Sequence, residues 1–207
     1  MRRLKTKRIA VLLLSPEIKI STKYRLAQLA GCSAAWAIML LKKWQQENIV
    51  RNLTVQQPMK LLEIIEKIQN PKREAKRYSI SNVTELMNWL KTTDFEYAFT
   101  TYSAENLLQK YLFPTKIEFY VKATDMDKWH AKLIEKGFYG AGNITVYVDK
   151  YDELFHRKKI GNYWIVNTPQ LIHDLAKEGG PAKEASDMLK QKLINSMHSE
   201  GNTNVSR

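Results

Sequence analysis

Residues 23–50 read KYRLAQLAGCSAAWAIMLLKKWQQENIV, and the predicted arrangement of the first part of the chain follows from them. The pattern predicts two helices joined by a short turn. Gly31 breaks the first helix where a tight turn needs a permissive backbone. Ser33 can cap the second helix, because its hydroxyl can accept a free amide N–H of the first turn. Apolar residues then recur at helical spacing from Ala34 to Gln46, so the stretch is typical of a helix-turn-helix.

The segments around this stretch extend the prediction to a winged helix-turn-helix domain over residues 1–69. A first helix is expected over residues 3–14, with a cluster of cations at its start. Val50 to Val55 is expected to form part of a small wing. A strongly apolar helix should begin at Pro58, and it is too apolar to stand alone on a surface. An ordinary helical hairpin within a core is the alternative interpretation of the same pattern.

The predicted second helix offers few hydrogen-bond donors to DNA bases. Apolar side chains can touch thymine methyl groups, but they cannot make the bidentate pairs that carry most base discrimination. Affinity for DNA is therefore expected to depend on phosphate contacts from nearby cations. The candidate DNA-binding residues are Lys23, Arg25, Ser33, Ala34, Ala35, Trp36, Ile38, Met39, Lys42, Lys43 and Arg51.

Charge is distributed unevenly along the 207 residues, whose formal net charge is +12. Residues 1–80 contain 17 Lys and Arg against 5 Asp and Glu, whereas residues 81–207 contain 16 of each. A polyanion-binding module joined to a neutral module would show this asymmetry, and double-stranded DNA is the expected partner. A membrane surface is the competing polyanion, but no long Lys-rich amphipathic helix with a broad apolar face is apparent.

The composition predicts a cytoplasmic protein without a cofactor, a bound metal or a membrane segment. Cys32 is the only cysteine, which excludes a disulfide within one chain and fits a reducing compartment. The four histidines lack metal-ligand spacing. The apolar run from Ile9 to Leu14 is too short for a signal peptide, and no stretch approaches the length of a membrane span.

The second part of the chain predicts an α/β domain over residues 83–196, which makes the fold class α+β. Residues 70–82 are expected to form a basic linker that adds contacts to DNA, and residues 197–207 a flexible polar tail. Three to five strands are expected, and Thr115–Lys122 alternates as a strand with one solvated face should. A helix is expected to begin at a capping Ser103.

Asp125 and Asp127 suggest a nucleotidyltransferase, since an Asp-x-Asp pair after a strand can hold Mg²⁺ against a triphosphate. That chemistry also needs an upstream Gly-Ser on a strand-to-helix turn, and none precedes the pair. Capping of the next helix explains the two acids as well. The chain is therefore not expected to be an enzyme.

The first part resembles the winged helix of the AbiEi-type antitoxins, which are regulators of type IV toxin–antitoxin systems. Gly31-Cys32-Ser33, Trp36 and the apolar helix from Pro58 are similar to the family's pattern. In the second part, residues 97–108 (YAFTTYSAENLL) and 168–189 (TPQLIHDLAKEGGPAKEASDML) are similar to its strand–turn–helix and its closing segment. The likeness covers most of residues 20–193. Ile38 and Met39 depart from it, since the family more often carries polar or basic residues there.

The resemblance implies a transcriptional regulator that binds operator DNA and represses its own promoter. It implies a C-terminal domain that neutralises a toxin protein and whose fold is a degenerate nucleotidyltransferase-like one. A homodimer would also fit, because two wings bind DNA better than one. Two alternatives stay open: a nucleotidyltransferase-like enzyme, and an RNA-binding or scaffold protein in which the helix-turn-helix is a protein interface.

Overall fold

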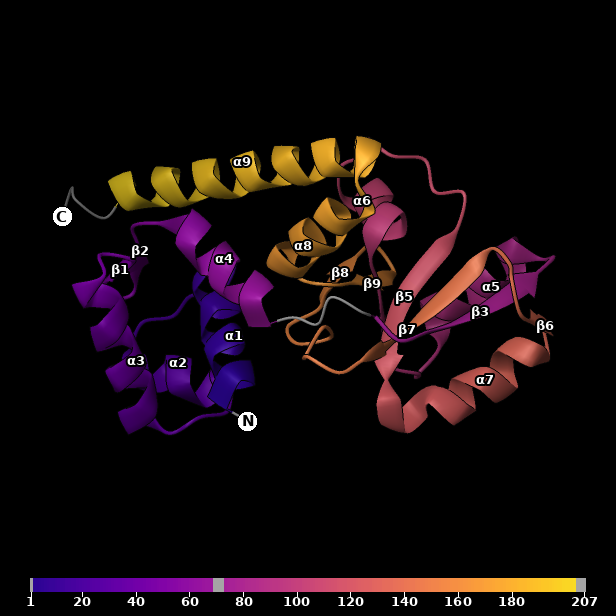
Figure 1. Ribbon diagram of the computed structural model, residues 1–207, viewed down its shortest axis with the longest axis horizontal. Coiled ribbons are helices and arrows are strands. Elements are labelled where there is room, and N and C mark those ends of the chain that lie inside the picture. The colour runs from indigo at the N-terminus through magenta and orange to yellow at the C-terminus, as the bar shows by residue number, and fades with distance from the viewer. Residues whose placement is uncertain (1, 69–72, 204–207) are drawn as a thin grey trace. The chain divides into compact units, whose positions relative to one another are not determined.

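The computed structural model describes residues 2–68 and 73–203, with side chains described as far as residue 197. It is a mixed α+β structure (Figure 1). The chain divides into two compact units. The first consists of Met1–Gln69 with Asp187–Arg207, and the second of Asn70–Ser186.

The first unit contains four helices and a two-stranded hairpin before the chain enters the second unit. Helix α2 packs on both α1 and α3, and α4 packs on α1. The apolar run from Ile9 to Leu14 is buried in this core. The predicted helix over Ala34–Gln46 is confirmed with the same bounds. The elements are α1 (Arg2–Leu13), α2 (Lys23–Ala30), α3 (Ala34–Gln46), β1 (Val50–Arg51), β2 (Thr54–Val55) and α4 (Pro58–Ile68).

The second unit is built around a seven-stranded mixed sheet with the order β6-β3-β7-β5-β4-β9-β8. The β5–β7 and β4–β9 pairs are parallel, and the other pairs are antiparallel. The strands are β3 (Ala75–Ile80), β4 (Tyr97–Phe99), β5 (Ile117–Lys122), β6 (Gly137–Tyr139), β7 (Ile144–Asp149), β8 (Lys158–Ile160) and β9 (Tyr163–Ile165). The helical elements are α5 (Val83–Thr92), α6 (Thr101–Leu108), the 3₁₀ turn η1 (Ala123–Asp125), α7 (Met126–Ile134) and α8 (Thr168–Glu178). Helix α9 (Gly180–Thr203) begins in this unit, and its residues from Asp187 onward belong to the first unit.

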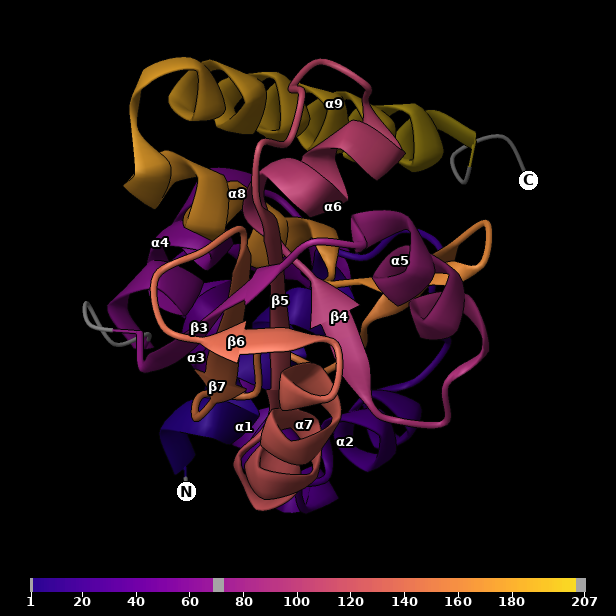
Figure 2. The same ribbon diagram turned by 90° about the vertical axis from the view of Figure 1, so that its right-hand side faces the viewer.

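Helices cover both faces of this sheet, with α5 and α7 on one side and α6 and α8 on the other (Figure 1, Figure 2). The side chains of strand β5 alternate between the two faces of the sheet, and they contact helices on both. Phe119 packs against Trp129 of α7, with ring centroids 5.1 Å apart. The neighbouring Tyr120 points the other way, and its hydroxyl donates to Asp174 of α8 at 3.2 Å. The prediction that this strand has one solvated face is therefore wrong.

The prediction that residues 70–82 form a linker is wrong for Ala75–Ile80, which form β3 inside the sheet. Tyr78 and Ile80 are buried, while Arg77 and Ser79 are exposed. Buried and exposed side chains therefore alternate along this segment, as in a strand, although it contains several cations. Residues 70–72 of the predicted linker lie outside the described residues.

The number of strands, two boundaries and one cap also differ from prediction. The sheet has seven strands instead of the predicted three to five, because short strands such as β6 and β8 give little local signal. The second unit ends at Ser186 rather than at residue 196, and α9 continues to Thr203 through part of the predicted tail. Residues 204–207 of that tail lie outside the described residues. Helix α6 begins at Thr101, so Ser103 lies within it and caps nothing. Its hydroxyl instead donates to the carbonyl of Lys116 and accepts the amide N–H of Glu118, both at 3.2 Å.

Candidate nucleic-acid interface

The turn between α2 and α3 follows from local chemistry. Gly31 adopts a left-handed conformation with φ of 66°, which ends α2. The amide N–H of Cys32 then donates to the carbonyl of Ala27 at 3.0 Å, so a backbone acceptor of the last turn is satisfied. The hydroxyl of Ser33 accepts the amide N–H of Trp36 at 3.4 Å, as the sequence predicts for the α3 cap. Ser33 is thus used to start the helix.

The two helices are bent by 111° relative to each other across this three-residue turn. Helix-turn-helix pairs lie at about 90–120°. The buried face of α2 consists of Leu26, Ala27 and Ala30. The buried face of α3 consists of Ala37, Leu41 and Trp44. The opposite face of α3 is therefore the one that can meet a ligand.

Replacing Gly31 with valine should destabilise the first unit by about 1–2 kcal/mol, because a β-branched residue is strained at positive φ. A Cβ at this position would also lie 3.0 Å from Nη1 of Arg8, a flexible group that can move aside. Gly31→Asn is the matched control and should cost less, since asparagine tolerates the left-handed region. Calorimetry of the full chain measures the difference, and equal losses for the two variants would contradict the argument.

The exposed residues of α3 include Ala35, Ile38, Met39 and Lys42, which follow the i, i+3, i+4, i+7 spacing of one helical stripe. Ile38 is 39% exposed and Met39 is 59% exposed. The structure thus places these four predicted residues together on one surface. Ala34 and Trp36, which were also predicted to contact DNA, are half-buried at its margin.

The predicted cationic contacts are divided between the helices and the hairpin. Lys42 and Lys43 are exposed on α3, and Lys43 lies 3.8 Å from Glu47 in an i,i+4 pair. Arg51 is exposed on β1, and Lys23 is half-buried at the start of α2. Arg25 is exposed and donates to the side-chain oxygen of Gln28 at 2.6 Å, so its guanidinium group is held along α2.

A shallow hollow of about 380 Å³ lies between α2 and the start of α3. Four of its lining residues were not among the predicted contacts, and two of these, Tyr24 and Gln28, are exposed. Their i,i+4 spacing on α2 is the sequence signal that could have indicated a shared face. Tyr24 is 76% exposed. The hollow is lined by Tyr24, Arg25, Ala27, Gln28, Cys32 and Ala34.

Cys32 lies half-buried in the turn. Burial raises the pKa of its thiol, and the positive charge of Lys5 lowers it by less. The net result is a raised pKa, so the thiol is protonated at neutral pH. It acts as a small, weakly polar filler between the helices.

The charge asymmetry remains when it is counted by compact unit. The first unit contains 16 Lys and Arg against 6 Asp and Glu, and the second contains 17 against 15. The excess positive charge therefore belongs mainly to the unit that carries α2 and α3. The excess counted for residues 1–80 was larger because it included the cations near residue 75, which belong to the second unit.

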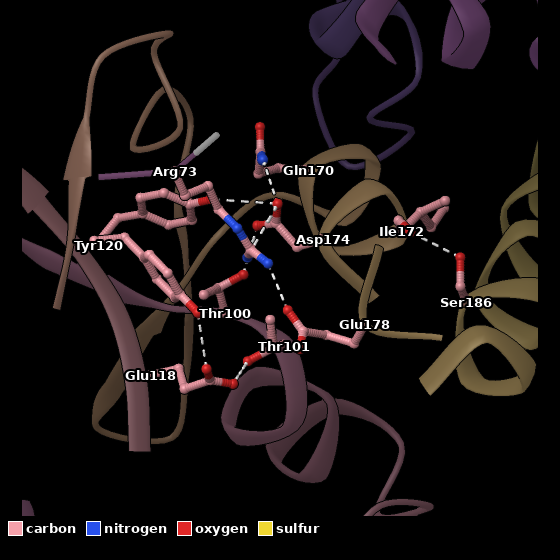
Figure 3. Close-up of polar contacts among 11 residues, drawn as sticks. Arg73, Thr100, Thr101, Glu118, Tyr120, Gln170, Ile172, Asp174, Glu178 and Ser186 are labelled. Carbon is pink, nitrogen blue, oxygen red and sulfur yellow. Dashed lines mark hydrogen bonds and ion pairs between the residues drawn. The ribbon is translucent and has the colours of Figure 1, made fainter. Parts of the chain in front are cut away.

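Arg73, which the linker prediction placed at DNA, belongs instead to a buried polar network in the second unit (Figure 3). Its Nη2 donates to Glu178 at 2.5 Å, and its Nη1 lies 3.8 Å from a carboxylate oxygen of Asp174. The guanidinium carbon lies 4.5 Å from the centre of the Tyr147 ring. Burial alone would lower the pKa of Arg73, but Asp174 and the other anionic partners raise it overall. This arginine is a structural cation.

Asp174 is the centre of this network and is fully buried. It accepts hydrogen bonds from Thr100 Oγ1 at 2.6 Å, Gln170 Nε2 at 3.0 Å and Tyr120 at 3.2 Å. Burial, followed by the charge of Asp174, raises the pKa of Tyr120 well above its ordinary value. The network ties α8 to the β4–α6 turn and to β5.

Asp125 and Asp127, the acids of the alternative nucleotidyltransferase prediction, lie at the start of α7. Asp125 lies 3.7 Å from Lys128, and Asp127 is exposed. The side chain of Asp125 does not make the predicted capping hydrogen bond. Within residues 2–68 and 73–197, no three His, Cys, Asp or Glu side chains gather where they could hold a metal ion.

Among the described helices, none is by itself long and apolar enough to cross a membrane; only α2 and α3 taken as one bent pair reach that length and composition. No family model, curated protein or solved structure matches this chain.

Proposed function

We propose that this protein binds double-stranded DNA by placing the exposed face of α3 in the major groove. The observation that carries the proposal is the geometry of α2 and α3. A capped helix is held at 111° to its neighbour across a three-residue turn, and its free face carries Lys42, with Lys43 next to it in sequence and also exposed. Phosphates on either side of a groove would attract these lysines.

The hairpin of β1 and β2 is proposed to act as a wing, which makes the first unit a winged helix-turn-helix. Its exposed Arg51 would contact the phosphate backbone beside the groove. Asn52 adopts a positive φ of 58° in the hairpin turn, a conformation that asparagine tolerates. Binding would then combine α3 in the groove with the wing on the backbone.

The resemblance to AbiEi-type antitoxins suggests what this binding would accomplish. The protein would repress its own promoter in the cytoplasm, and the second unit would bind a toxin or another protein partner. The second unit is proposed to be a degenerate nucleotidyltransferase-like domain, and a homodimer would bring two α3 helices to one operator. The second unit has nearly balanced charge, 17 Lys and Arg against 15 Asp and Glu, which supports a protein partner for it rather than DNA.

Titration of the full chain into a fluorescent duplex at several salt concentrations tests the proposal. Affinity should fall as salt rises, with a slope of about −0.9 in log–log form for each phosphate contacted. Structured RNA of equal length serves as the competitor. Failure to bind the duplex would contradict the proposal, and equal competition by RNA would favour an RNA-binding protein.

A further inference from the structure

The exposed face of α3 presents methyl and thioether groups in the part of the helix that would meet DNA bases. Ala35, Ile38 and Met39 occupy the stripe's first three positions, and none of their side chains donates a hydrogen bond. The first donor on the stripe is the ammonium group of Lys42, nearly two helical turns after Ala35. The side chains of Ala35, Ile38 and Met39 can therefore be attracted to bases only through apolar contact.

The thymine C5 methyl is the apolar group that the four ordinary bases offer on the floor of the major groove. Burying it against Ile38 or Met39 removes apolar surface of both partners from water. The same side chains against guanine or cytosine would cover acceptors and donors without replacing their hydrogen bonds to water, which costs free energy.

We infer that α3 is a methyl reader, which selects duplex DNA whose major groove is lined by thymine methyl groups at the contacted positions. The inference rests on the proposed DNA-binding function and names the class of DNA that the site takes. Selectivity would then come from Ile38 and Met39. Attraction to phosphate would come from Lys42 and Lys43, so the two properties can be changed separately.

A random pool of short duplexes provides the probe. The full chain enriches its preferred sequences from the pool, and the enriched pool is then resynthesised with deoxyuridine in place of thymidine. Uracil keeps every hydrogen-bonding group of thymine and lacks only the methyl. Affinity should fall about fourfold for each contacted methyl that is removed. The enriched pool should also contain more A·T pairs than the starting pool.

The variant Ile38→Ser with Met39→Gln assigns the effect to α3. It should bind the thymine and uracil pools equally. Met59→Gln is the matched control, because Met59 is also exposed in the first unit, at 44%, but lies on α4. This control should keep the full preference for thymine.

The outcomes separate the inference from the function on which it rests. Equal affinity of the unaltered protein for both pools would overturn methyl reading while leaving DNA binding intact. A thymine preference that persists in the α3 variant would overturn the assignment to Ile38 and Met39. Binding to neither pool would overturn the proposed function itself, and a dimer dissociated by the same variant would identify the face as a protein interface.

Discussion

Replacing Lys42 and Lys43 together with glutamate should abolish duplex binding while the protein stays folded. Both side chains are exposed, and the contact of Lys43 with Glu47 is a surface pair that contributes little to stability. Each phosphate contact contributes about 0.9 to the slope of log affinity against log salt. At about 0.1 M salt, the loss of two contacts should therefore weaken binding about 100-fold. Repulsion between the new carboxylates and phosphate adds to this loss.

The variant Lys60→Glu with Lys67→Glu is the matched control, because it changes the net charge by the same amount. Both lysines are exposed on α4 in the same unit, and Lys60 lies 3.4 Å from Glu63. If only the overall charge of the unit mattered, the two double variants would bind equally weakly. We expect the α4 variant to bind at least about tenfold more tightly than the α3 variant, and a smaller difference would contradict the role of α3.

Replacing Asp174 with alanine should have the largest effect on stability, lowering the free energy of unfolding of the second unit by about 3–5 kcal/mol. The change removes the acceptor for Thr100, Gln170 and Tyr120 and leaves Arg73 without one of its two carboxylate partners. A donor that stays buried without an acceptor destabilises the folded state by its full desolvation free energy. The unfolding midpoint of this unit should fall by about 10 °C or more in calorimetry of the full chain.

Two further variants test whether the lower free energy of unfolding comes from the buried network. Glu135→Ala breaks an exposed pair with Lys132, in which the carboxylate lies 2.6 Å from the ammonium group, and should cost less than about 1 kcal/mol. Asp174→Ala combined with Arg73→Met should cost less than the sum of the two single changes, because the residues interact. A loss below about 1 kcal/mol for Asp174→Ala would contradict a stabilising network.

The features predicted correctly from sequence are those set by residues close together in the chain. The bounds of α3 follow from the Ser33 cap and from apolar spacing, and the end of α2 follows from Gly31. The exposed positions of Ile38 and Met39 follow from the same periodicity. Capping and helical spacing act within a few residues, so one sequence contains the whole signal.

The features missed depend on contacts between distant residues. The segment that forms β3 was predicted to be a linker because its cations indicate exposure to solvent. It belongs to the sheet through its pairing with β6 and β7, which are distant in the chain. Arg73 and Asp174 are separated by 100 residues in the chain, and nothing local marks them as partners. Glu118 and Tyr120 appeared to be the solvated side of β5, yet they are buried because α6 and α8 cover that face. Polarity alone does not separate a solvated position from a paired, buried one.

Site-directed photocrosslinking tests most directly whether α3 lies in the DNA groove. Cys32→Ser removes the only native cysteine. Met39→Cys is then added to that background and labelled with an azidophenacyl group, and Met59→Cys on α4 is labelled in the same way as the control. We expect light to crosslink the Met39 derivative to the duplex, and we expect little product from the Met59 derivative. A crosslink from the Met59 derivative alone, while the Met39 derivative still binds the duplex, would contradict this expectation.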